Sequence, residues 1–160
     1  MHFKHLGAAL LLASTFTIAA CGGSDPLTAE AEPEGVPGLS VTNARIVLPP
    51  VAGNPAAVYF DLAYDNDRGL TVRKADVAGA ESAMLHDYNE FEGKMQMMEA
   101  LPIGIKKGTN ISFKPGAAHV MVFGLSPDLK AGDSADVTLT VSGGGTYTFP
   151  AEIRSAGDER

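Results

Sequence analysis

The 160-residue chain is 45% hydrophobic and 19% charged, a balance typical of one globular domain with short accessory segments and unlike that of a disordered chain. Its formal net charge of −7, with no cluster of lysine and arginine, argues against nucleic acid as a partner because an acidic surface repels phosphate backbones. Eighteen glycines and ten prolines indicate many turns and favour an all-β architecture.

The first 20 residues are typical of a secretory signal peptide. Lys4 provides the charged start, and the apolar run Leu6–Ala20 is shorter than the about 20 residues that a transmembrane helix needs. The run ends in Ile18–Cys21, which resembles a bacterial lipobox, the signal after which a cysteine is lipidated and becomes the first mature residue. We therefore predict lipidation of Cys21, the only cysteine in the chain. The alternative is an ordinary cleaved signal with a cysteine nearby.

The residues that follow Cys21 predict a location and a tether. Gly22 in place of Asp resembles lipoproteins that are sorted to the outer membrane of a Gram-negative envelope, so we expect a membrane-anchored protein in the periplasm. Residues 21–38 are rich in glycine, proline and acidic side chains, and a flexible tether of this length reaches about 20–25 Å. We expect the folded domain over residues 39–154 and a polar tail over 155–160.

Short alternating segments separated by turn residues fill the predicted domain. In residues 58–64, for example, apolar side chains alternate with others, the pattern of a strand with one buried face. Glycines 143–145 predict a hairpin turn, since no helical pattern follows them that would suit a phosphate-binding loop. Strands are predicted, in chain order, at 39–48, 58–64, 70–77, 83–90, 95–101, 103–106, 110–114, 119–125, 137–141 and 146–153. Many short strands at this spacing indicate a β-sandwich or a small barrel.

Histidine and methionine gather in one part of the predicted domain. Met1, His2 and His5 belong to the signal peptide, and all the others lie between residues 84 and 121: His86, His119, Met84, Met95, Met97, Met98 and Met121. His119 and Met121 are two apart in a strand-like run, so both side chains leave the same face of the strand. The pairs Met84 with His86 and Met95 with Met97 have the same spacing.

The donor atoms of this cluster favour copper(I). Imidazole nitrogens and thioether sulfurs are borderline and soft ligands, and a site without thiolate or carboxylate donors favours copper(I) over zinc, calcium or magnesium. We predict that His86, Met97, His119 and Met121 bind the metal, with Met84 and Met95 as possible auxiliary ligands. A lone methionine on a strand is more often core filler, and this interpretation is favoured for Met84, Met95 and Met98. The acidic residues nearby are predicted to form a solvated rim: Asp87, Glu90, Glu92 and Glu99.

The same residues carry a resemblance to a known family. His86, ten residues, Met97, twenty-one residues, His119, one residue and Met121 match the motif of the periplasmic copper chaperones called PCu(A)C. The likeness extends over residues 39–153, through PAAVYFDLAYDND, KPGAAHVMVFGL and LKAGDSADVTLTV. The resemblance implies a cupredoxin-like Greek-key β-barrel that binds copper(I) at its surface. It also implies delivery towards the binuclear copper centre of cytochrome c oxidase, in its copper-bearing subunit, alongside Sco-type thiol proteins.

Two features depart from many members of that family. Their His- and Met-rich tail is replaced here by Ser155–Arg160, which argues against a second copper site. Many members are soluble in the periplasm, whereas this chain carries a predicted anchor, so it is expected to serve a membrane-bound client or to store copper locally.

Other functions explain the sequence less well. An electron-transfer cupredoxin needs a cysteine thiolate, and no cysteine follows Cys21. An enzyme is not expected, because the chain has no G-x-S-x-G element and no thiol nucleophile. A structural envelope lipoprotein without metal predicts methionines scattered through the core rather than clustered. Copper sequestration for tolerance needs the same site as delivery, so the sequence leaves both open.

Overall fold

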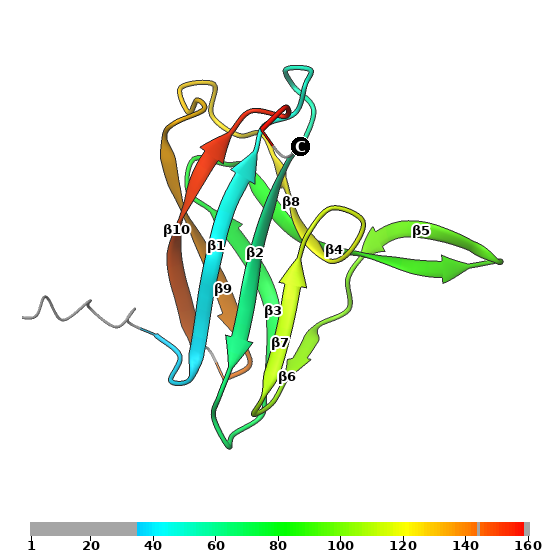
Figure 1. The fold of residues 1–160 in the computed structure, drawn as a ribbon, viewed down its shortest axis with the longest axis vertical. Coiled ribbons are helices and arrows are strands. Elements are labelled where there is room, and N and C mark those ends of the chain that lie inside the picture. Colours follow the sequence, from blue (N-terminus) through cyan, green and yellow to red (C-terminus); the bar gives the residue numbers. More distant parts are fainter. Residues whose placement is uncertain (1–34, 144, 159–160) are drawn as a thin grey trace, which may run out of the picture. The chain divides into compact units, whose positions relative to one another are not determined.

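The computed structural model describes residues 35–143 and 145–158, which form ten strands and no helix (Figure 1). The predicted signal peptide, the lipidation site Cys21 and most of the predicted tether lie outside these residues. Each predicted strand is present, with its ends moved by at most three residues. The strands are β1 (Leu39–Val47), β2 (Ala56–Tyr64), β3 (Leu70–Val77), β4 (Ser82–Phe91), β5 (Lys94–Glu99), β6 (Ile103–Ile105), β7 (Thr109–Phe113), β8 (His119–Phe123), β9 (Ser134–Val141) and β10 (Thr146–Arg154).

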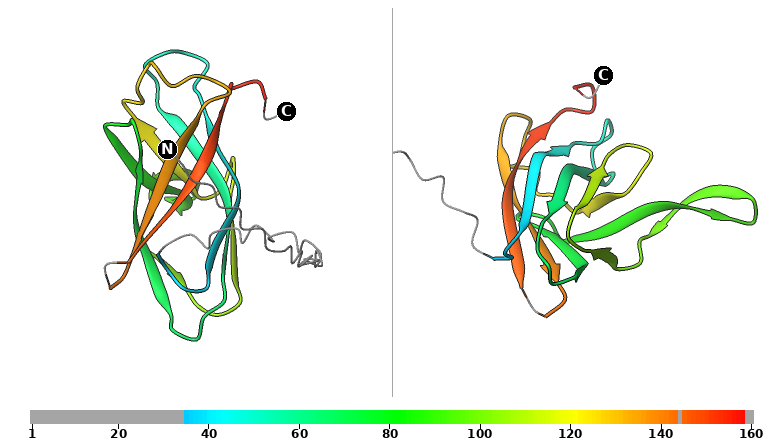
Figure 2. Two further views of the ribbon diagram at one scale, coloured as in Figure 1. Left: turned by 90° about the vertical axis from the view of Figure 1, so that its left-hand side faces the viewer. Right: turned by 60° about the horizontal axis from the view of Figure 1, so that its bottom comes forward.

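The strands form one mixed sheet that curves around a single core (Figure 2). Its order is β5-β4-β8-β2-β1-β10-β9-β3-β6, and β7 also pairs with β2. The pairing of β1 with β10 is parallel and the other pairings are antiparallel. Strands far apart in the chain are neighbours, as in the Greek-key arrangement that the resemblance implies. Among the described residues, no helical segment has the length and hydropathy for crossing a bilayer.

One edge of β2 is shared by two strands, and this sharing positions β8. β7 pairs with β2 along Phe60–Tyr64, and β8 pairs with it along Ala56–Val58. Between them the chain turns at residues 114–118, where Lys114 and Ala118 are joined by a backbone hydrogen bond of 2.9 Å. The turn lets the chain leave the register of β7 and re-enter beside β4, so β8 lies between β2 and β4.

The core follows the period-two alternation of the strands. In β2 every second residue is buried, including Val58, Phe60 and Leu62, and Phe60 stacks on Phe113 with ring centroids 4.2 Å apart. In β8, Val120 and Val122 are fully buried, so their neighbours point to the opposite, outer face of the sheet. Burying one such side chain contributes roughly 1.5–3 kcal/mol.

The hairpin of β4 and β5 extends beyond the other strands (Figures 1 and 2). Its two-residue turn, Glu92 and Gly93, has φ angles of 51° and 74°, the left-handed conformation that a tight type I′ turn requires at both positions. Every residue of β5 is exposed, and β5 forms one end of the sheet order. The hairpin is therefore anchored by the part of β4 that pairs with β8.

Candidate metal site

The register of β4 against β8 brings two histidines face to face. His86 lies directly opposite His119, and their ring centroids are 5.9 Å apart. Two residues along the same strands, Met84 lies opposite Met121. Since residues two apart share a face, all four side chains lie on the outer face, away from Val120. The structure thus brings together three of the four predicted ligands and adds Met84 beside them.

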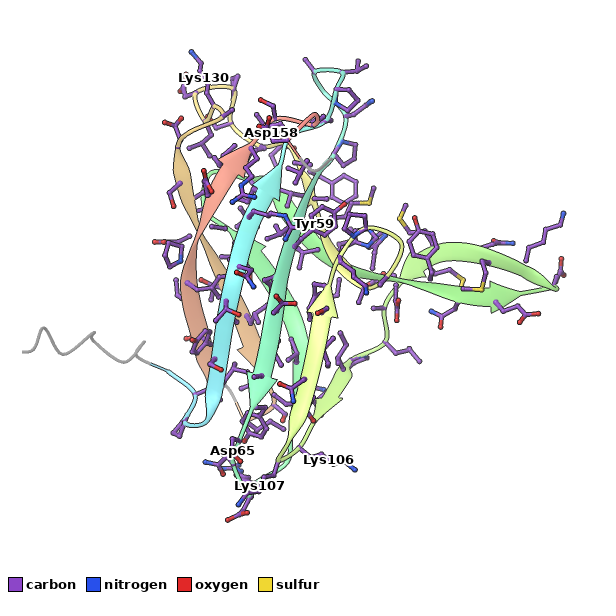
Figure 3. The ribbon with its side chains drawn as sticks, in the orientation of Figure 1. Tyr59, Asp65, Lys106, Lys107, Lys130 and Asp158 are labelled. Atoms are coloured by element: carbon purple, nitrogen blue, oxygen red, sulfur yellow. The ribbon has the colours of Figure 1, made fainter. Side chains whose placement is uncertain are left out.

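The fourth predicted ligand, Met97, comes from β5. It lies opposite Tyr88, which is two residues from His86 on β4, so Met97 is a diagonal neighbour of His86 on the same face. Met95 shares that face but lies one step further along the hairpin, opposite Glu90. Figure 3 shows the sulfur atoms in yellow, running from the region of β8 outward along the hairpin.

Met98 lies on the other face of the hairpin. It pairs with Asp87, and both residues alternate with those that face His86. Met98 is therefore separated from the histidine pair by the backbone of the hairpin. It provides an internal comparison for Met84 and Met97, which have nearly the same exposure.

The interpretation of Met84, Met95 and Met98 as core filler is wrong. These side chains are 40%, 64% and 38% exposed, and Met97 is 42% exposed. The reason is their location, because Met95 and Met98 are on the edge strand β5, whose residues are all exposed, and Met84 lies on the outer face of β4. Met84 and Met95, predicted as possible auxiliary ligands, differ in position, since only Met84 lies directly beside the histidine pair.

His119 is fixed in one orientation at the start of β8. It is only 6% exposed, and it is the one buried polar or charged residue within the described part of the chain. Its Nδ1 lies 2.9 Å from the carbonyl oxygen of Ala117, and because a carbonyl can only accept, Nδ1 carries the proton. In the neutral ring the lone pair is then on Nε2. A backbone carbonyl that holds the non-ligating nitrogen is the usual arrangement of a metal-binding histidine.

His86 carries an unsatisfied nitrogen. Its Nδ1 is buried and has no hydrogen-bond partner, the one such side-chain nitrogen or oxygen in residues 35–143 and 145–158. Desolvation by burial lowers the pKa of His86, the neighbouring His119 lowers it further, and Glu99 acts in the opposite direction. A neutral imidazole with an unused lone pair fits a metal ligand, since metal binding requires the deprotonated ring.

Two tyrosines surround the histidine pair, and sequence reasoning missed both. Tyr88 and Tyr59 have ring centroids 6.2 Å from that of His119, on opposite sides in the strand order. The guanidinium of Arg45 lies 5.2 Å from the Tyr59 ring, which Figure 3 labels on β2. Tyr88 was detectable from its spacing of two residues from His86. Tyr59 was not, because its position depends on the pairing of β2 with β8.

The donor atoms on this face are two imidazoles and several thioethers, and one carboxylate, Glu99 of β5, lies directly opposite His86. The described residues contain no group of three or more His, Cys, Asp or Glu side chains placed to hold a metal ion, so a carboxylate-rich or histidine-rich site is absent from them. Of the predicted acidic rim, Glu90, Glu92 and Glu99 are exposed and Asp87 is partly buried. Two imidazoles with neighbouring thioethers suit copper(I) better than harder cations.

Comparison with known proteins supports the fold and gives a family. A family model described as "LpqE-like: Putative lipoprotein LpqE-like" matches residues 39–153. A relative from Leifsonia xyli subsp. xyli, "Putative lipoprotein Lxx21020", is 29% identical over 148 residues, which cover 92% of this chain and 86% of the relative.

Two solved structures share the fold. The apo PCuAC domain from PmoF1 is 22% identical with a TM-score of 0.64, and the match covers 78% of this chain and 99% of that domain. The solution structure of CuI-DR1885 from Deinococcus radiodurans is 25% identical with a TM-score of 0.59, covering 79% of this chain and 85% of that protein. The predicted cupredoxin-like fold and the resemblance to PCuAC domains are confirmed.

Proposed function

This chain belongs to the LpqE-like family of lipoproteins, and from that premise and the geometry of the site we propose that it is a copper(I) carrier, not an enzyme. One copper(I) ion per chain is held on the outer face of β4, β5 and β8. The ligands are His86, His119, Met121 and Met97, and the ion is cargo that leaves the protein again.

The observation that carries the proposal is the histidine pair. His119 is locked by Ala117 with its Nε2 lone pair available, and 5.9 Å away between ring centroids His86 holds a buried nitrogen without a partner. An unsatisfied buried nitrogen costs about 1–3 kcal/mol unless something binds it. The thioethers beside the pair carry no proton and make no disulfide, so they suit copper(I) in an oxidising compartment.

A competition titration tests this proposal. The full chain is titrated anaerobically with copper(I) against a chromophoric copper(I) chelator, alongside the His86→Ala and His119→Ala variants. We expect one tight site per chain and severe weakening in both variants. Met98→Ala is the matched control, because its side chain is on the other face of the hairpin. Unchanged affinity in both histidine variants contradicts the proposal.

We further propose that the carrier delivers copper(I) towards the binuclear copper centre of cytochrome c oxidase, alongside Sco-type thiol proteins. Support comes from the resemblance to the PCu(A)C chaperones and from the exposure of Met97 on a hairpin that an acceptor can reach. Copper loading of the oxidase in cells with and without the protein separates delivery from sequestration. Reduced loading on deletion supports delivery. Normal loading together with copper sensitivity supports sequestration.

Lipidation of Cys21 is proposed to hold the domain at a membrane, on the periplasmic side and in the outer membrane as Gly22 predicts. The family name agrees with an anchor of this kind. Cys21→Ser should release the protein from the membrane fraction or block its processing, which fractionation and mass measurement detect. Wild-type protein found wholly in the soluble fraction contradicts the anchor.

A further inference from the structure

We infer that Met84 is a fifth copper ligand, interchangeable with Met97, so that two overlapping ligand sets share His86, His119 and Met121. The inference rests on the proposed copper(I) site and extends it. One set uses the thioether of Met84, on the rigid sheet. The other set uses the thioether of Met97, on the projecting hairpin.

Register places Met84 closer to the other ligands than Met97. Residues directly opposite in an antiparallel pair have Cβ atoms about 4.5–5.5 Å apart, whereas diagonal neighbours are about 7–8 Å apart. Met84 is directly opposite Met121, as His86 is directly opposite His119. These four side chains form a compact block on two hydrogen-bonded strands. Met97 reaches the block only diagonally, from the third strand.

Exposure also favours Met84 as a ligand. Met84 is 40% exposed, well outside the buried core. Within the described residues, the other large exposed apolar side chains are mostly on the same hairpin. Met84 is therefore not explained by the core, whose members on β4, Ala83 and Leu85, lie on the opposite face. Its side chain leaves the same face of the sheet as the histidine pair.

Two interchangeable thioethers give the site a route for release. When an acceptor reaches the exposed hairpin, the bond from copper to the Met97 sulfur breaks and a bond to an acceptor ligand forms. His86, His119 and Met121 still hold the ion, and Met84 takes the place of Met97 among the ligands. The exchange replaces the Met97 thioether by the acceptor ligand and transfers no electron, so copper stays in the +1 state. If the acceptor ligand is a thiol, its proton is released to solvent as the sulfur binds the metal. Met84 keeps the ion on the protein until the acceptor has engaged.

Single and double variants test the interchange. Met84→Ala and Met97→Ala should each lower copper(I) affinity by about tenfold, because the other thioether replaces the missing one. The double variant should lose more than about a thousandfold, well beyond the product of the single losses. Met98→Ala, with 38% exposure but on the other face, should change nothing. Met84→Ala that behaves like Met98→Ala, both alone and in the Met97→Ala background, overturns the inference.

Methyl NMR of the full chain gives a direct readout. With 13C-methyl methionine, one equivalent of copper(I) should shift the signals of Met84, Met97 and Met121 and leave Met98 in place. In the Met97→Ala variant the Met84 shift should grow. Copper(I) binding with an unmoved Met84 signal overturns this inference alone, whereas a wild-type chain that binds no copper(I) overturns the proposed function as well.

Discussion

Strands β8 and β5 both carry proposed copper ligands, but the fold supports them very differently. β8 is hydrogen-bonded on both sides, to β2 and β4, and its inner residues Val120 and Val122 are fully buried. β5 is an edge strand on a projecting hairpin, and all six of its residues are exposed. The same type of ligand is thus presented once from the rigid sheet and once from its most accessible edge.

The difference indicates how one site can both hold and release an ion. Ligands on β8 and the paired part of β4 are fixed by the core behind them, so they need little ordering when copper binds. Met97 lies where the chain opens locally at low free energy, because an edge hairpin has few buried contacts. The ligands on β8 and β4 then retain the copper ion, and the ligand on β5 makes the ion accessible to an acceptor.

Loss of a ligand on the rigid side should have the largest effect. His119→Ala removes both the nitrogen donor and its bond to Ala117. Copper(I) affinity should fall by more than the roughly 10–100-fold that the loss of a partner behind a metal ligand costs. Competition titration measures the loss, and circular dichroism of the apo protein checks the fold. A folded His119→Ala protein with wild-type affinity is inconsistent with a site centred on β8.

The two regions should also differ in their contribution to stability. Val122→Ala, behind the site, should lower the free energy of unfolding by about 2 kcal/mol, from lost burial and the cavity left behind. Met95→Ala on the exposed hairpin should change it by less than about 0.5 kcal/mol. Urea unfolding of the apo proteins measures both. Equal effects would mean that the hairpin is part of the cooperative core.

The hairpin turn offers a way to detach β5 without touching a ligand. Gly93 has a φ of 74°, and a β-branched residue is strained in that conformation by about 1–2 kcal/mol. Gly93→Val should loosen the end of the hairpin and weaken copper(I) binding by no more than Met97→Ala does, about tenfold, with the core intact. Affinity and thermal unfolding of both variants are compared. A Gly93→Val loss as large as that of His119→Ala would show that the rigid strands alone do not hold the ion.

A change of pH above about 6.5 should have the smallest effect on copper(I) affinity. Thioethers carry no proton, and burial holds the pKa of His86 below the ordinary histidine value of about 6.5. Since protons and copper compete for the same nitrogen, affinity should stay flat as the pH falls to about 6.5 and decrease only below it. A thiolate site would already lose affinity below about pH 8.5. Titrations between about pH 5 and pH 9 distinguish the two.

The strands and one half of the site were predictable from local sequence. Alternation in β2 marked its buried face, and the two-residue spacing placed His119 and Met121 on one face of β8. These features depend only on the period of a strand, which is a local property. The cupredoxin-like fold was predicted from the resemblance to a known family, and the match to solved PCuAC domains confirms it.

The rest of the site depends on register, which is set by long-range pairing. Nothing in the local sequence of β4 says that His86 faces His119 or that Met84 faces Met121. A shift of β4 by one residue in its pairing with β8 would have turned the side chains of Met84 and His86 into the core. The core assignment of Met84 failed because it used the average preference of methionine, whereas its exposure follows from the open outer face of β4. Tyr59 was missed because its position beside His119 depends on the pairing of β2 with β8.

X-ray absorption at the copper edge of the full chain, loaded with one equivalent of copper(I), tests the His/Met site most directly. A copper(I) edge with both imidazole nitrogen and thioether sulfur as near neighbours is expected, with the sulfur contribution reduced in the Met84→Ala Met97→Ala double variant. A shell of nitrogen and oxygen alone, or sulfur that is unchanged in that variant, would contradict copper binding by the histidines and methionines of β4, β5 and β8.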